Sequence, residues 1–135
     1  MPVVSRVGGR LPLHATGVGK VLLAWAPEDV QREVFASLTP LTRHTIVQPG
    51  LLREQLARVR SEGYAQTVEE MTLGACSVAV PVRCRPDGAV VAALGVVVAD
   101  LRRGRSRLVS ALQVTAAGIG RSWAANGLSL SESPG

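Results

Sequence analysis

Leu11 to Trp25, near the start of the chain, combines residue types that can bind phosphate or move a proton. The segment reads LPLHATGVGKVLLAW and holds two glycines, one of the two histidines and the only lysine, Lys20. Glycines followed by a lysine can cradle a phosphate at a helix start. A histidine beside a nucleophile can act as a general base. The segment therefore suggests nucleotide binding, catalysis, or a helix start that binds another ligand.

Both nucleotide-binding motifs fail in this segment. A nucleoside-triphosphatase loop requires GxxxxGK followed by Ser or Thr, because the hydroxyl holds magnesium. Here His14 stands where the first glycine is required, and Val21 follows the lysine. A dinucleotide fingerprint, GxGxxG, requires a third glycine where this chain has Leu22. Nucleotide chemistry is therefore not expected.

The same glycines are suited to a helix start. Thr16 predicts an N-cap for a helix that runs to about Ala24. The first N–H groups of a helix lack partners inside it, and Gly17 and Gly19 would let a ligand approach them closely. A carboxylate is a natural ligand for such groups. The alternative is structural: the glycines allow the helix to pack tightly against a strand.

No catalytic set accompanies the histidine. His14 has no Ser or Cys nucleophile with a paired acid near it in the sequence, so we expect a hydrogen-bonded structural residue. Glu69 and Glu70 are adjacent on a predicted strand and should point to opposite faces, which favours surface charge or turn capping. Cys76 and Cys84 form no CxxC pair, so we expect reduced thiols, no metal and no cofactor. The sequence does not predict an enzyme.

The charge and composition exclude further classes. The net charge of +5 rests almost entirely on arginine, and LRRGRSR at residues 101–107 could meet phosphate or an acidic partner. Only 3% of the residues are aromatic, so the chain offers no platform for stacking the bases of a nucleic acid. We expect this segment and Lys20 to be ordinary surface. No signal peptide and no run long enough to span a membrane is evident. These features predict a cytoplasmic protein that does not bind membranes.

Hydrophobic periodicity and turn residues predict the other elements. In chain order they are a strand (3–7), helices (16–24, 27–37 and 50–62), a strand (64–70), a hairpin (76–82 and 89–99) and a closing helix (106–125). The second helix should turn Val30, Val34 and Leu38 inward, and Pro81 indicates an edge position or a bulge. Helices followed by a hairpin-rich sheet and a helix predict an α+β domain with a largely antiparallel sheet.

Four segments carry a family resemblance. They are GGRLPLHATGVGKVLLAW, the helix ending in RSEGYA, VEEMTLGACSVAVPV, and RPDGAVVAALGV. Their order and spacing over about residues 3 to 125 resemble the effector-binding domain of IclR-type bacterial transcriptional regulators. The resemblance implies a GAF-like fold with helices on both sides of the sheet. It divides the chain into an effector-binding domain, 1–125, and a polar tail, 126–135.

The resemblance also implies an effector site. Carried over by motif, its residues are Val3, Gly17, Val18, Thr67, Ser77, Gly95 and Val97. Gly17 and Val18 would present backbone amides to a carboxylate. Thr67 stands where members that bind small keto acids have an acidic residue, and Gly95 and Val97 stand where those members have serines. An unpaired buried polar ligand atom costs about 1–3 kcal/mol, so we expect a carboxylate with an apolar or aromatic body.

The family organisation implies partners. In the family, an N-terminal winged helix-turn-helix binds DNA, and the effector domain contributes to dimer or tetramer contacts. From the alignment of these motifs, we expect the winged domain and the first strands of the effector domain to be missing from these 135 residues. We therefore expect a small organic acid as effector, a homodimer or tetramer, and DNA binding only through a winged domain absent from this sequence. The alternative is a free-standing GAF-like metabolite-binding module that does not bind DNA.

Overall fold

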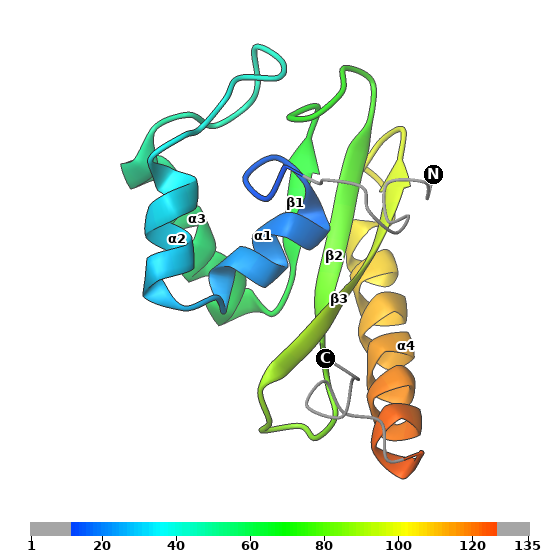
Figure 1. Ribbon diagram of the computed structural model, residues 1–135. Helices are drawn as coiled ribbons and strands as arrows, with labels where there is room; N and C mark the ends of the chain where they lie inside the picture. Colours follow the sequence, from blue (N-terminus) through cyan, green and yellow to red (C-terminus); the bar gives the residue numbers. More distant parts are fainter. Residues whose placement is uncertain (1–11, 127–135) are drawn as a thin grey trace.

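In the part of the chain that the structure describes, a three-stranded antiparallel sheet lies between helices on both of its faces (Figure 1). The computed structural model describes residues 12–126, so the predicted strand at 3–7 and residues 127–135 of the predicted tail lie outside the described residues. The elements are α1 (Gly17–Ala24), α2 (Glu28–Phe35), α3 (Pro49–Glu62), β1 (Ala65–Val68), β2 (Cys76–Arg83), β3 (Val90–Val98) and α4 (Arg105–Ala125). The predicted α+β class, with helices flanking an antiparallel sheet, is confirmed.

Helix α1 begins where its capping residue predicts. Thr16 is extended, with φ −118° and ψ 152°, and its side chain accepts a hydrogen bond from the Gly19 amide at 3.0 Å. Val21 and Leu23 are completely buried. The cap and the apolar residues together fix both the start of α1 and the face that it turns to the sheet.

Helices α2 and α3 meet the predictions to different degrees. Helix α3 ends at Gly63, whose φ of 83° is left-handed, and it buries the predicted Leu52, Leu56 and Val59. Helix α2 ends at Phe35, before the predicted Ser37, and has no buried residue. The prediction that Val30 faces inward is wrong, because its side chain is 37% exposed. Val34 and Leu38 do pack against the core.

The strand register places residues in rows across the sheet. In the row beside the start of α1, Thr67 pairs with Ser77 and Ser77 pairs with Val97. Because residues that pair directly across neighbouring strands point to the same side of a sheet, these three residues share the face on which α1 packs. Pro81 lies in the central strand, but β1 pairs only with Cys76–Ala79, so within residues 12–126 no strand pairs with that edge of β2 at Pro81.

The opposite face of the sheet packs against α4. The spacing of apolar residues correctly predicts this helix, and the residues that it buries are Val109, Leu112, Ala116 and Gly120. Thr115 and Ile119 lie on α4 as well but are not part of its buried face: Thr115 is exposed, and Ile119 is 39% exposed. A Cβ at Gly120 would lie 1.9 Å from the Arg83 carbonyl oxygen, so glycine allows helix and strand to touch. Within residues 12–126, no helix combines the length and the apolar character of a membrane span.

Candidate functional site

The start of α1 is joined to the sheet by a short chain of hydrogen bonds. The Gly17 amide donates to Ser77 Oγ at 3.0 Å, and Ser77 Oγ lies 2.6 Å from Thr67 Oγ1. Gly17 and Thr67 are buried. The first amide of a helix, a hydroxyl of β2 and a hydroxyl of β1 therefore form one continuous polar row.

Two glycines make this close approach possible. A Cβ at Gly17 would lie 2.9 Å from Ser77 Oγ and 3.3 Å from Ala79 Cβ. A Cβ at Gly95 would lie 2.8 Å from Val18 Cγ1. The Val18 side chain thus fills the space above Gly95, and a side chain at position 95 would require Val18 to move. Gly17 therefore packs tightly against β2, and this packing places a helix amide beside two hydroxyls.

The residues that the sequence predicts for the effector site lie together, apart from Val3, which is outside the described residues. Thr67, Ser77 and Val97 form one row across the sheet. Gly95 lies two residues from Val97 on the same strand, beneath Val18. Val97 is 51% exposed. The cluster has a polar end at the helix start and an apolar flank on β3.

The chemistry that this cluster can perform is binding. A helix N-terminus carries a partial positive charge and favours an anion. The Thr67 and Ser77 hydroxyls can both donate and accept hydrogen bonds. No group of three or more His, Cys, Asp or Glu side chains within residues 12–126 could hold a metal ion. The cluster is suited to an anionic group beside an apolar one.

The expected structural roles of His14 and Glu69 are confirmed. His14 is buried, and its Nε2 lies 2.8 Å from the Thr39 carbonyl oxygen. Glu69 has a φ of 57°, and its Oε2 accepts from the Gly74 amide at 3.0 Å, which caps the turn between β1 and β2. His14 therefore joins the segment before α1 to the segment after α2, and Glu69 closes the turn after β1. Cys76 and Cys84 are free thiols, the first buried and the second half-buried.

The expectation that Lys20 lies on the surface is wrong, and Glu70, expected as surface charge or a turn cap, is buried beside it. The Lys20 side chain is completely buried, and its Nζ lies 2.7 Å from Glu70 Oε1 and 2.5 Å from Gln55 Oε1. Burial lowers the pKa of Lys20 from its ordinary value, and the Glu70 carboxylate opposes that shift. Lysine is rarely buried unless it is paired, and this partner lies 50 residues away along the chain. The available signal was a single lysine inside the apolar run of α1.

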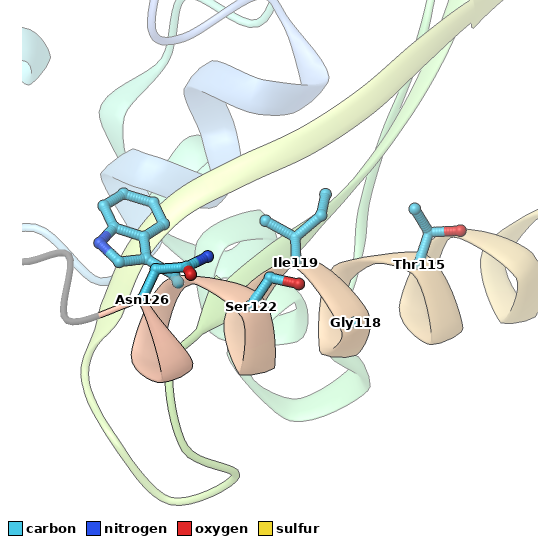
Figure 2. Close-up of a pocket in the computed structure, with 6 residues that line it drawn as sticks. Thr115, Gly118, Ile119, Ser122 and Asn126 are labelled. Atoms are coloured by element: carbon cyan, nitrogen blue, oxygen red, sulfur yellow. The ribbon is translucent and has the colours of Figure 1, made fainter.

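The arginine-rich segment is exposed surface, as expected, except for the buried Leu101. Arg102 pairs with Asp100, with Nη2 3.0 Å from Oδ2. A separate hollow of about 600 Å³ lies on the C-terminal part of α4 (Figure 2). Its lining residues are Thr115, Gly118, Ile119, Ser122, Trp123 and Asn126. None of them belongs to the cluster at the start of α1.

Comparisons with known proteins agree on one family. The family model described as bacterial transcriptional regulator IclR, C-terminal, matches residues 1–121. The HTH-type transcriptional regulator KdgR of Dickeya chrysanthemi is 42% identical over 94 residues, which are 68% of this chain and 30% of that protein. The chain therefore spans less than half the length of this relative.

Solved structures share the fold. An IclR homologue from Microbacterium hydrocarbonoxydans, complexed with 4-hydroxybenzoate, matches with a TM-score of 0.80 and 34% identity, covering 93% of this chain and 51% of that one. A double mutant of the PobR inducer-binding domain from Acinetobacter, complexed with 3-hydroxybenzoic acid, matches with a TM-score of 0.74 and 33% identity. That match covers 85% of this chain and 69% of the other.

Proposed function

The chain belongs to the IclR family of bacterial transcriptional regulators, as its C-terminal domain, and from this premise we propose that it senses a carboxylate with an apolar or aromatic body. Residues 1–125 form the effector-binding and oligomerisation domain of a cytoplasmic homodimer or tetramer, and residues 126–135 form a tail. DNA is contacted through a winged helix-turn-helix and not through this domain. The effector acts by favouring one arrangement of the attached DNA-binding domains.

The observation that carries the proposal is the hydrogen bond from the Gly17 amide to Ser77 Oγ, 3.0 Å long. The Ser77 hydroxyl oxygen lies where an anion would meet the start of α1. A carboxylate would displace it, accepting from the Gly17 amide with one oxygen and from the Val18 amide with the other. Hydrogen bonds to a charged acceptor are stronger than those to a neutral hydroxyl.

The rest of the site favours an apolar ligand body. Val18 fills the space above Gly95, and Val97 offers a half-exposed apolar surface in the same row as Ser77. The Thr67 hydroxyl is already bonded to Ser77 and carries no charge. A small keto acid would leave its carbonyl oxygen without a strong partner. The two structural neighbours hold hydroxybenzoates, which are carboxylates with an aromatic ring.

Isothermal titration calorimetry on this chain tests the proposal. The panel contains 4-hydroxybenzoate, benzoate and octanoate against glyoxylate and pyruvate, with methyl 4-hydroxybenzoate as the uncharged control. We expect an aromatic or medium-chain acid to bind at least about tenfold more tightly than the keto acids and the ester, a difference of about 1.4 kcal/mol. Tight binding of glyoxylate or pyruvate, with none of the larger acids, would refute the proposal.

A further inference from the structure

A buried ion pair joins the two halves of the candidate site. Lys20 lies on α1, one turn beyond Gly17, and Glu70 follows β1 three residues after Thr67. Lys20 Nζ lies 2.7 Å from Glu70 Oε1, and the Lys20 side chain is 0% exposed. Gln55 of α3 accepts a second hydrogen bond from the same Nζ. The pair therefore connects the helix that carries the amide to the strand that carries the hydroxyl.

Glu70 is itself fixed to the neighbouring loop. Thr45 Oγ1 donates to the Glu70 carbonyl oxygen at 2.6 Å, and Thr42 Oγ1 donates to the Glu69 carbonyl oxygen at 2.6 Å. Thr45 is buried. The segment between α2 and α3 therefore fixes the backbone of Glu70. The Glu70 carboxylate, in turn, fixes the position of α1 through Lys20.

The physical chemistry of buried ion pairs favours a geometric role for this one. Removing two charges from water is costly, and apolar side chains of similar volume often give equal or greater stability. Apolar packing has no preferred direction, whereas a charged hydrogen bond fixes the separation of two particular atoms. The distinctive contribution of the pair is therefore the position of α1 relative to β1.

We propose that Lys20 and Glu70 are positioning residues that hold the Gly17 amide in line with Ser77 and Thr67 and thereby set the affinity for a carboxylate. Neither side chain takes part in the hydrogen bonds among these three residues, so the pair acts through the placement of α1. The inference rests on the proposed function for its ligand. The effect of the ion pair on the position of the Gly17 amide does not depend on a ligand.

The test is the double variant K20M/E70M, which removes both charges and leaves neither one unpaired in the core. The matched control, R102Q, removes the exposed pair between Asp100 and Arg102. Hydrogen exchange at the Gly17 amide is measured by NMR against the α4 amides, and 4-hydroxybenzoate affinity by calorimetry. We expect exchange at Gly17 to rise at least about tenfold relative to α4. We expect affinity to fall about tenfold, with R102Q unchanged in both.

A folded K20M/E70M variant with wild-type exchange at Gly17 would overturn the inference. If 4-hydroxybenzoate does not bind the wild type, that failure counts against this acid as a ligand and the exchange experiment still decides the positioning role. If the double variant does not fold, E70D replaces it, because this change keeps the charge and moves the carboxylate back by one methylene. We then expect the same increase in exchange at Gly17 to a smaller degree, and unchanged exchange would again overturn the inference.

Discussion

The Ser77 hydroxyl links the two sides of the site. It accepts from the Gly17 amide at 3.0 Å and shares a hydrogen bond with Thr67 at 2.6 Å. Both partners are buried. A buried donor that loses its partner costs more than the net value of the bond, because water does not replace the missing group. One hydroxyl therefore satisfies a helix end and a strand side chain at once.

Replacing Ser77 with Ala tests this role. We expect S77A to lower the free energy of unfolding by about 1–3 kcal/mol, because the Gly17 amide and the Thr67 hydroxyl each lose a buried partner. Urea unfolding gives the difference. The control is T115A, which removes an exposed hydroxyl that bonds within its own helix, to the Ala111 carbonyl oxygen. T115A should change stability by less than about 0.5 kcal/mol, and equal effects of the two changes would contradict the prediction.

Short-range residue roles could be predicted from the sequence, and long-range ones could not. Thr16 caps α1 through an amide three residues away, and Gly63 ends α3, so both signals are complete within a few residues. The burial of Lys20 could not be predicted from its neighbours in the sequence. A charge is expected in water until its partner is known, and its partner, Glu70, is brought to it only by the folded sheet.

The contacts between α1 and the strands could be expected from the family resemblance. The local pattern of apolar and polar residues did not indicate which strands α1 would meet. Alternation along β2 separates Ser77 and Ala79, under α1, from Val78 and Val80, under α4. The hairpin was predictable because the turn and both strands are adjacent in sequence. The position of Val18 above Gly95 was not, since it depends on how closely a helix approaches a strand 70 and more residues later.

Helix α4 depends on one glycine for its contact with the sheet, although glycine weakens a helix. A Cβ at Gly120 would lie 1.9 Å from the Arg83 carbonyl oxygen, whereas one at Gly118 would meet only Arg121 Nη2 at 3.7 Å. The same substitution should therefore have opposite effects two residues apart. The substitution at Gly118 therefore reports on the propensity of the chain to form the helix, and the one at Gly120 reports on the packing of the helix against the sheet.

We expect G118A to raise the free energy of unfolding by about 0.5–1 kcal/mol, because alanine favours the helix and restricts the unfolded chain. We expect G120A to lower it by about 1–3 kcal/mol, because the new methyl group forces α4 away from β2. Chemical denaturation followed by circular dichroism measures both. Stabilisation by G120A would show that α4 does not contact Arg83 as described.

At the scale of the whole molecule, the sheet belongs to two hydrophobic clusters. One contains Leu52 of α3 and Ala79 of β2, and the other contains Val78 of β2 and Leu112 of α4. Strand β2 contributes residues to both clusters. If one cluster came apart, one face of β2 would be exposed to water, and the other cluster would lose the support of that strand. The described part of the chain is therefore expected to unfold as one cooperative unit. A ligand at the start of α1 would then stabilise α4 on the far face through the shared sheet.

The two tryptophans of the chain report on opposite sides of this sheet. Trp25 packs against the cluster beside α1, and Trp123 lies on α4. In a W25F background Trp123 is the only tryptophan, so adding L52A places the change on one face and the tryptophan probe on the other. Truncating the completely buried Leu52 should cost about 2–5 kcal/mol. We expect Trp123 fluorescence and far-ultraviolet circular dichroism to show the same lowered urea midpoint relative to W25F alone. If Trp123 kept the midpoint of W25F while the circular dichroism midpoint fell, the two faces would be independent, and a ligand at α1 could not act on α4 through the sheet.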